Sequence, residues 1–270
     1  MRAMSVHPAA IVSPEAQLGS GVVVGPFAVI ESRTVVGDGC EIRAHAVVKA
    51  GTTLGCENRV HEGAILGGEP QDLSFAGGDT RLVVGDRNIF REGVTVHRST
   101  KPGSATVIGS DCFLLAYAHV AHDNRIGDRA ILGNNLMLAG HVEIGERAFL
   151  SGGVGVHQFC RIGRLAMIGG TSKLVQDCLP FVITDGHPAR ARGLNVVGLR
   201  RAGFTAEQRL EMKKLYHALF RSGKNFGEAV AEARKNFPSP GAKAMLEFIT
   251  GAKRGVCADT GKIHGDNEDE

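Results

Sequence analysis

The chain has 270 residues, no tryptophan, only 5% aromatic residues and a formal net charge of +3 at pH 7. This weak positive balance, without a basic run interleaved with aromatic residues, argues against nucleic-acid binding. The longest apolar stretches are far shorter than a bilayer span, and the start MRAMSVHPAA lacks the apolar core of a signal peptide. We therefore expect a cytoplasmic chain with one large domain or two smaller ones.

An aliphatic residue recurs every six positions over most of the chain. The first run holds this period from Val12 to Leu66, and a short stretch repeats it at Val84, Phe90 and Val96. The last run has twelve positions, all Ile, Leu or Val: Ile108, Leu114, Val120, Ile126, Leu132, Leu138, Ile144, Leu150, Val156, Ile162, Ile168 and Leu174. A period of six predicts a parallel β-helix, in which three hexads make one coil of eighteen residues. Neighbouring coils then stack about 4.8 Å apart.

Two other positions of the hexad are also regular. The residue after the aliphatic is often glycine, as at Gly127 and Gly145, and we attribute this to corners that need unusual backbone angles. The residue four after the aliphatic is usually small, as at Ala118 and Ala130. One bulky and one small inward residue per hexad would fill a narrow prism.

The six cysteines follow the same pattern. Four of them occupy the small inward position: Cys40, Cys112, Cys160 and Cys178. We expect these to be buried small hydrophobic residues, whereas Cys56 and Cys257 lie off that position. No C-x-x-C pair occurs, so the sequence supports neither a zinc ribbon nor a redox pair, and a reducing compartment suits it.

Two interruptions and a change of period divide the chain. The β-helix is predicted to occupy residues 1–189, with exposed loops near 67–81 and 101–106, and such insertions often lie on the binding face. The Gly- and Pro-rich stretch 180–203 resembles a linker that leaves the prism.

A helical domain is predicted over 190–256. Thr205 and Gln208 form a capping-box pattern, and Gly223 ends that helix. Two further helices are predicted over 228–236 and 243–249, and the acidic residues 257–270 are predicted to be a disordered tail. Six cations cluster in this domain: Lys213, Lys214, Arg221, Lys224, Arg234 and Lys235. They form either a solvated helix face or a docking surface for an acidic partner protein.

Residues eighteen positions apart lie above one another on adjacent coils. This register stacks His122 with Gly140 and Gln158, and it stacks Asp123 with His141, while His119 lies one short strand away. His122 can act as a general base near neutral pH, and Asp123 can orient its imidazole.

The other stacked residues suit a reaction at a hydroxyl group. The Gly140 N–H can stabilise an oxyanion, and His141 and Gln158 can bind sugar-type hydroxyls. Because no Ser or Cys nucleophile lies beside the base, we expect direct attack by a substrate hydroxyl and no covalent acyl-enzyme.

Two other functions remain open at this point. His97, His119, His122, His141 and His157 could ligate a metal, as in hexapeptide-repeat hydratases that bind zinc through three histidines between subunits. A non-catalytic solenoid scaffold is the other alternative.

Five strings give a more specific resemblance. They are QDLSFAG at 71–77, HVAHDNRIG at 119–127, LAGHVEIG at 138–145, VHQFCRIG at 156–163 and GLNVVGLRRAGF at 193–204. In this order they resemble the UDP-N-acetylglucosamine O-acyltransferases that begin lipid A biosynthesis. The resemblance spans nearly the whole chain and implies a left-handed β-helix, which the period alone does not indicate, since parallel crossovers are usually right-handed.

The resemblance implies a homotrimer with active sites between the prisms and no cofactor. Each site would transfer an (R)-3-hydroxyacyl group from acyl carrier protein to the 3-hydroxyl of UDP-N-acetylglucosamine. His122 matches the family's general base, Asp123 its orienting partner and Gly140 its oxyanion donor. The implied substrate-binding positions are Gln71, Asp72, Ser74, His119, His141, Gln158, Asn195 and Arg201, of which Asp72 holds the sugar and the last two bind the nucleotide.

Some positions depart from the family pattern. Ser74 stands where many relatives carry Lys, Val197 where some carry Glu, and Pro188 where some carry a nearby His. Gly170 falls at the position that limits acyl length, which implies a deep pocket and a long chain. A diamino UDP-sugar remains an alternative acceptor. A related N-acyltransferase with an additional N-terminal domain is disfavoured because the repeats begin by Val12.

Overall fold

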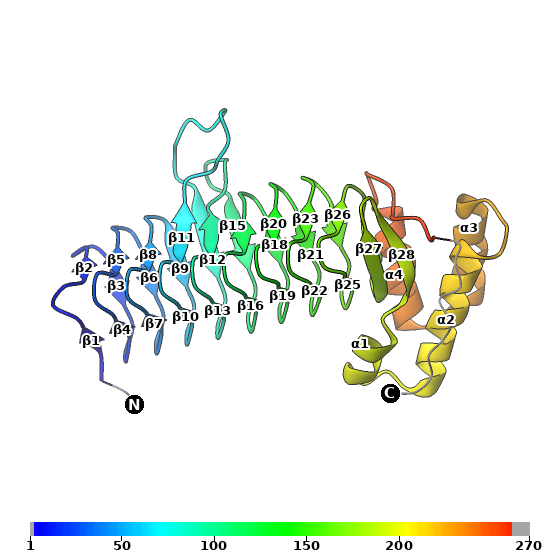
Figure 1. Cartoon of the computed structure of the whole chain (residues 1–270), viewed down its shortest axis with the longest axis horizontal. Helices are drawn as coiled ribbons and strands as arrows, with labels where there is room; N and C mark the ends of the chain where they lie inside the picture. Colours follow the sequence, from blue (N-terminus) through cyan, green and yellow to red (C-terminus); the bar gives the residue numbers. More distant parts are fainter. Residues whose placement is uncertain (1–2, 261–270) are drawn as a thin grey trace.

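A three-sided prism forms most of the computed structural model, which describes residues 3–260 (Figure 1). Sheet A contains β1 (Ser5–Val6), β4 (Val23–Val24), β7 (Glu41–Ile42), β10 (Arg59–Val60), β13 (Ile89–Phe90), β16 (Phe113–Leu114), β19 (Ile131–Leu132), β22 (Phe149–Leu150), β25 (Met167–Ile168), β27 (Val182–Gly186) and β28 (Ala189–Leu194). Sheet B contains β2 (Ile11–Val12), β5 (Val29–Ile30), β8 (Val47–Val48), β11 (Ile65–Gly68), β14 (Thr95–His97), β17 (His119–Val120), β20 (Met137–Leu138), β23 (Gly155–Val156) and β26 (Lys173–Leu174). Sheet C contains β3 (Gln17–Leu18), β6 (Val35–Val36), β9 (Thr52–Leu54), β12 (Arg81–Val84), β15 (Ala105–Ile108), β18 (Arg125–Ile126), β21 (Glu143–Ile144) and β24 (Arg161–Ile162). Successive strands belong to sheets A, B and C in turn. Each coil therefore has three corners, which are named A–B, B–C and C–A after the two sheets that each corner joins.

The predicted register is confirmed where the repeat is unbroken. On sheet B, His119 pairs in parallel with Met137, which is eighteen residues further along. The two loops break this register, because Arg59 pairs with Ile89 and Thr95 pairs with His119. The stacking of sequence neighbours is therefore regular in the half of the prism that follows the second loop.

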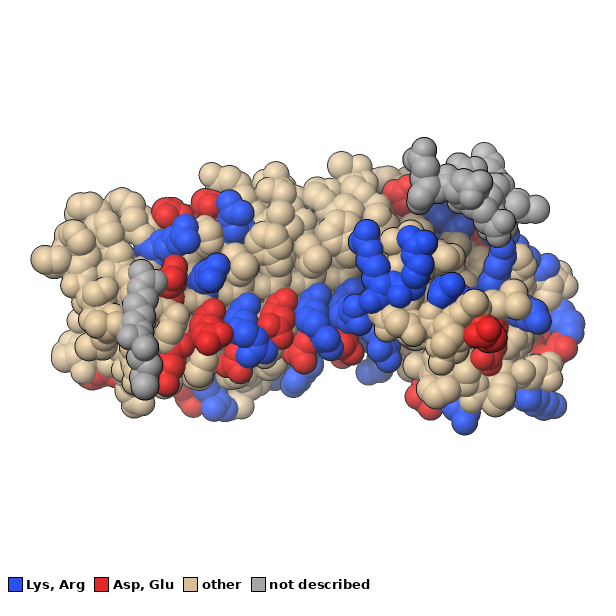
Figure 2. Space-filling view, turned by 90° about the horizontal axis from the view of Figure 1, so that it is seen from below, with Lys and Arg blue, Asp and Glu red and all other residues tan. Residues whose placement is uncertain are grey.

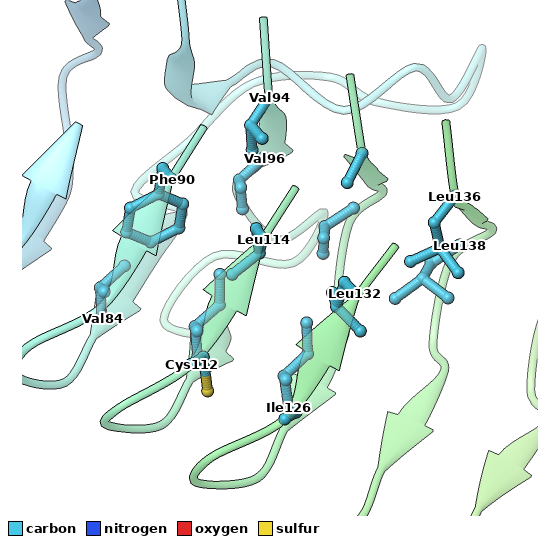
Figure 3. Close-up of a cluster of buried hydrophobic side chains, with 14 of the residues drawn as sticks. Val84, Phe90, Val94, Val96, Cys112, Leu114, Ile126, Leu132, Leu136 and Leu138 are labelled. Carbon is cyan, nitrogen blue, oxygen red and sulfur yellow. The ribbon is translucent and has the colours of Figure 1, made fainter. Parts of the chain in front are cut away.

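The core is the predicted ladder of aliphatic side chains. Figure 3 shows Phe90, Leu114 and Leu132 in successive coils of sheet A inside the prism, with Leu138 of sheet B in the same coil as Leu132. The four cysteines at the small position are buried, as predicted, and Cys56 is exposed. Cys257 is also buried, because it packs against the last coil from outside the repeat.

The glycines that follow the aliphatic residues serve close packing. A Cβ at Gly127 would lie 2.7 Å from the backbone nitrogen of Glu146, and one at Gly145 would lie 2.3 Å from that of Arg164. Neither glycine has a left-handed backbone. The expectation that they supply unusual backbone angles is therefore wrong. They are glycine because the next coil passes too close for a side chain.

The stretch 180–203 continues the sheet and is not a linker. β27 pairs in parallel with β25, and β28 pairs antiparallel with β27, so this hairpin extends sheet A beyond the last coil. The backbone groups on the open edge of β25 are therefore paired, which removes the exposed edge of sheet A at this end of the prism.

Four helices follow the hairpin: α1 (Val196–Arg201), α2 (Ala206–Phe220), α3 (Phe226–Asn236) and α4 (Pro240–Thr250). The capping box of Thr205 and Gln208 is present, whereas α1 was not predicted, and the helical part begins after residue 190 because β28 belongs to the sheet. Residues 257–260, predicted to be disordered, bond to the prism through Cys257 N–H to Asp177 O. The rest of the predicted tail, 261–270, lies outside the described residues. Within residues 3–260, each helix is too short or too polar to cross a membrane.

Candidate active site

The B–C corner brings the predicted catalytic residues together. His122 follows β17, and its Nδ1 lies 2.9 Å from Oδ2 of the neighbouring Asp123. In the next coil His141 lies edge-on to His122, with ring centroids 5.3 Å apart, and its Nε2 is 3.7 Å from the same Asp123 oxygen. The His122 and Asp123 side chains are only 12% and 11% exposed, so this pair is largely shielded from water.

Asp123 is held from two sides. Its backbone has a left-handed φ of 59°, which turns the carboxylate back toward His122. Thr100 donates its N–H and its hydroxyl to that carboxylate, with the hydroxyl at 2.7 Å, and the Asp123 N–H donates to the Thr106 hydroxyl at 2.8 Å. Burial raises the pKa of Asp123, but the hydrogen bonds from Thr100 and His122 outweigh it and leave the pKa below its usual value. Asp123 is therefore an anion that can fix the imidazole tautomer.

Gly140 lies directly beneath the imidazole. A Cβ at this position would be 2.4 Å from Cε1 and 2.7 Å from Nε2 of His122, so any other residue would displace the ring. Within residues 3–260 the Gly140 N–H donates no hydrogen bond. This free donor beside a base is the arrangement that an oxyanion-stabilising group needs.

A groove runs from this corner along the outer face of sheet B. Its lining includes Gln71, His119, His122, Gly140, Gln158 and Lys173. His141 stacks on Phe159 in the coil that follows, with ring centroids 4.8 Å apart. The predicted stack of His122, Gly140 and Gln158 therefore lines one continuous groove.

The loop between β11 and β12 brings a second carboxylate to the base. Asp72 Oδ2 lies 3.9 Å from His122 Nε2, on the side of the ring opposite Asp123. The N–H and the hydroxyl of Ser74 both donate to Asp72 Oδ1, at 2.8 Å and 2.7 Å, and they lower the pKa of Asp72. Ser74 thus orients Asp72 directly.

His119 lies on the strand face behind the base. Its Nδ1 is 2.7 Å from the hydroxyl of Thr95, and its ring meets that of His97 edge-on at 5.0 Å. Burial lowers the pKa of His119. It is thus favoured as a neutral ring that can donate or accept a hydrogen bond.

Three predicted residues lie at other corners of the same protomer. Asn195 caps α1 and donates to the carbonyl of Leu165 at the C–A corner, and Arg201 ends that helix. Gly170 is on the A–B corner, between β25 and β26. In Figure 1, α1 and the loop that carries Asp72 lie on opposite sides of the prism. One protomer therefore does not gather all of the predicted site residues.

Of the five histidines considered as possible metal ligands, two lie together in one protomer. His122, Asp123 and His141 have ligand atoms within 4.8 Å of one another. Within residues 3–260, no such group contains His97, His119 or His157.

Three supporting residues were missed in the sequence. Thr100 and Thr106 flank the second loop, and only the position of that insertion hinted at them. Asn124 is a polar residue at a small inward position, which is a signal that could have been used. Its amide donates to the carbonyls of Ala121 and Ala139 and accepts from Val142 N–H, so it ties together the two coils of the site.

Comparisons with known proteins agree with this geometry. A family model described as "Udp N-acetylglucosamine O-acyltransferase; Domain 2" matches residues 177–257, and the model of the bacterial transferase hexapeptide matches residues 15–50. An acyl-[acyl-carrier-protein]--UDP-N-acetylglucosamine O-acyltransferase of Burkholderia orbicola is 48% identical over 257 residues, which cover 93% of this chain and 98% of the relative. A Synechocystis protein of the same name is 43% identical over 71% of this chain and 70% of its own length.

Solved structures support the same assignment. UDP-N-acetylglucosamine acyltransferases from Bacteroides fragilis and Francisella novicida align with TM-scores of 0.91 and 0.92, at 36% and 32% identity. These alignments cover 93% and 95% of this chain and 99% and 95% of the other two. The left-handed β-helix implied by the resemblance is thereby confirmed. This chain belongs to the family of acyl-[acyl-carrier-protein]--UDP-N-acetylglucosamine O-acyltransferases.

Proposed function

We propose that this chain acts in the cytoplasm and transfers an (R)-3-hydroxyacyl group from acyl carrier protein to the 3-hydroxyl of UDP-N-acetylglucosamine, the first step of lipid A biosynthesis. One observation carries the proposal. The His122 imidazole is bonded to a shielded Asp123 carboxylate and lies against Gly140, whose N–H is free within the described residues. A base and an oxyanion donor on one wall are what hydroxyl attack on a thioester requires.

The proposed mechanism follows from these contacts. Asp123 accepts a hydrogen bond from the Nδ1–H of His122, which leaves Nε2 unprotonated and free to act as the base. Nε2 removes the proton of the sugar 3-hydroxyl, and the hydroxyl oxygen attacks the carbonyl carbon of the thioester. The Gly140 N–H stabilises the resulting oxyanion. When the tetrahedral intermediate collapses, the C–S bond breaks, and the proton on His122 passes to the leaving thiolate.

The proposed acceptor fits the second carboxylate. Asp72 faces His122 Nε2 across 3.9 Å, at the edge of the groove. A carboxylate at that position can accept hydrogen bonds from sugar hydroxyls and hold the ring with its 3-hydroxyl at the base. We assign the same role of contacting substrate to Gln71, His119, His141 and Gln158.

We also propose that the enzyme is a homotrimer. Asn195 and Arg201 lie near the C–A corner and Gly170 lies on the A–B corner, whereas His122 lies on the B–C corner. A threefold arrangement would bring different corners of neighbouring prisms together at each site. Leu73, at the tip of the loop that carries Asp72, is fully exposed in one protomer, as expected of a residue that a second copy covers.

Acyl carrier protein is acidic, and we propose that it binds the helical domain. Figure 2 shows Lys and Arg side chains gathered where the prism meets the helices. Arg221 of the predicted cluster bonds Asp259 at 2.9 Å, and Lys224 pairs with Glu232, so these two serve the fold. Arg234 of the same cluster donates to the Thr250 hydroxyl, so the exposed Lys214 and Lys235 are the better candidates for docking.

The decisive experiment is turnover with 3-hydroxyacyl-acyl carrier protein and UDP-N-acetylglucosamine. The wild type should turn over, and His122→Ala should lower kcat about a thousand-fold, the range of a lost general base. His45→Ala is the matched control, since this corner histidine stacks on Phe27 and contacts none of the site residues described above. Unchanged unfolding midpoints for both variants would show intact folds. Absence of wild-type turnover, or near-normal turnover by His122→Ala, would refute the proposal.

A zinc-dependent hydratase is the second candidate, because His122, Asp123 and His141 could hold a metal ion. Metal analysis of the purified protein separates the two. Stoichiometric zinc that is lost in His141→Ala would favour the hydratase. The turnover assay can also be run with thioesters of graded length and with a diamino UDP-sugar as a competing acceptor. It would then give the acyl length set by Gly170 and the preferred acceptor.

A further inference from the structure

The loop of residues 69–80 needs an anchor if Asp72 is to act. It leaves the prism after β11 and returns at β12, and it projects from the rest of the fold (Figure 1). Ser74 orients the Asp72 carboxylate, but Ser74 belongs to the same loop. The position of Asp72 relative to His122 therefore depends on whatever ties the loop to the prism.

Arg98 makes that connection. It directly follows β14, and its Nε donates to the Thr80 hydroxyl at 2.9 Å, at the end of the loop. Its Nη1 donates to the carbonyl of Gly67 at 3.2 Å, in β11 just before the loop. One guanidinium thus joins the two ends, and its side chain is only 14% exposed.

The same side chain also contacts the body of the loop. Nη2 of Arg98 donates to Glu69 at 3.0 Å, and the guanidinium lies 5.7 Å from the centroid of the Phe75 ring. The Arg98 backbone N–H adds a bond to the Gly68 carbonyl at 2.9 Å. The loop is therefore held at its start, middle and end by one residue of the prism.

We propose that Arg98 is a positioning residue that fixes the distance between Asp72 and His122 and so sets the affinity for the acceptor sugar. This rests on the proposed function, in which Asp72 holds that sugar. Two residues further along, Thr100 bonds Asp123. One short segment of the prism thus places the two carboxylates that flank the base.

Lysine should not replace Arg98. A guanidinium offers five N–H donors in a planar fork, whereas an ammonium is a compact point charge. Arg98→Lys keeps the charge and most of the stem but cannot reach Thr80, Gly67 and Glu69 together. This substitution therefore tests whether the several N–H donors of the guanidinium are needed, while the positive charge is kept. Arg81→Lys is the matched control, because Arg81 uses Nη2 to bond the Gly103 carbonyl of the other loop.

Steady-state kinetics should separate positioning from general damage. Arg98→Lys should raise KM for UDP-N-acetylglucosamine about ten-fold while KM for acyl carrier protein stays within about two-fold, and Arg81→Lys should change neither. In an Asp72→Asn background, Arg98→Lys should add less than about two-fold, because the contact through which it acts is gone.

The outcomes are distinct from failure of the proposed function. No wild-type turnover would refute the function itself. With an active wild type, an unchanged acceptor KM in Arg98→Lys would overturn the role of Arg98. So would equal rises for both substrates, or a full effect in the Asp72→Asn background. Amide hydrogen exchange gives a reading without catalysis, since residues 69–80 should exchange faster in Arg98→Lys than in Arg81→Lys.

Discussion

The B–C and C–A corners of the prism share one backbone but carry different chemistry. Asp123 at the B–C corner and Asp111 at the C–A corner occupy the same hexad position, and both have a φ of 59°. Asp111 bonds Arg87 in the coil before it through both carboxylate oxygens, at 2.7 Å and 2.9 Å. Asp123 instead bonds an imidazole in its own turn.

The C–A corner neutralises its own charges. Arg87 pairs with Asp111, and Arg129 pairs with Glu146, so acids and bases alternate along the prism, as the row of red and blue side chains in Figure 2 illustrates. Such exposed pairs contribute about 0–1 kcal/mol each. At the B–C corner, Gly140 in the next coil leaves space for the His122 imidazole. The N–H of Gly140 donates no hydrogen bond within the described residues. The backbone turn is the same at both corners. The chemical function of a corner therefore depends on which side chains and backbone N–H groups remain without a hydrogen-bond partner there.

Gly140→Ala should produce the largest difference between corners. The new Cβ would overlap the His122 ring at 2.4 Å and push it away from its substrate. We expect kcat/KM to fall about a hundred-fold or more, since a displacement of about 1 Å can cost that much. Gly152→Ala is the control at the same hexad position of the A–B corner, where the Cβ would lie 3.3 Å from the Asn134 carbonyl. A similar loss in both variants would mean that the glycine supports the coil and not the imidazole.

Asp123→Asn and Asp111→Asn form a matched pair. Asparagine tolerates the left-handed backbone, so both variants should keep their turns. At position 123 the amide no longer holds the imidazole in the required tautomer, and kcat should fall about a hundred-fold. Loss of the exposed pair at position 111 should leave kcat unchanged and cost at most about 1 kcal/mol. Equal kinetic effects, measured with saturating substrates, would contradict the comparison.

The sequence predicted the prism well because its signal is repeated in every coil. A core that needs one aliphatic residue per hexad shows that need at Ile108, Leu114 and each later step. The register of eighteen then placed His122 against Gly140. The same arithmetic could not reach Asp72, whose position depends on an insertion, and only the resemblance pointed to it.

Apart from the role of the recurrent glycines, the errors come from features that occur once. The abundance of Gly and Pro in 180–203 predicts a linker, yet β27 pairs with the open edge of β25. That edge is a property of the folded prism and has no local sequence signal. Likewise Thr100 lies one coil before Asp123 because the second insertion lengthens the register there from 18 to 24 residues, and the regular spacing does not encode that shift.

Asn124→Ala and Asn58→Ala separate stability from function at the two corners. Each asparagine donates to two carbonyls of adjacent coils and accepts one backbone N–H, Asn124 at the B–C corner and Asn58 at the C–A corner. Asn58 also accepts a bond from the side-chain amide of Asn88. Both Asn124 and Asn58 are fully buried, so each alanine should cost about 2 kcal/mol in urea unfolding through unsatisfied buried groups. Only Asn124→Ala should also lower kcat, since it loosens the turn that carries His122. Unchanged kcat in Asn124→Ala would show that Asp123 and Thr100 alone fix the base.

A pH dependence should distinguish the histidine-rich side of the prism from the C–A corner. His97 lies beside His119 and is only 8% exposed, and burial, with the neighbouring His119, lowers its pKa from 6.5 to about 4. The folded state thus favours neutral His97, so this stabilisation is complete above pH 6.5 and is lost as pH falls toward 4.

We expect the free energy of unfolding to be about 2 kcal/mol lower at pH 5 than at pH 7.5, because the unfolded chain takes up the proton first. Asp111 at the C–A corner stays ionised over this range, since bonding to Arg87 lowers its pKa further below the usual value of 3.8. Urea unfolding at fixed protein concentration should therefore show a flatter pH dependence in His97→Gln and an unchanged one in Asp111→Asn. The same slope in the wild type and in His97→Gln would assign the effect to other groups.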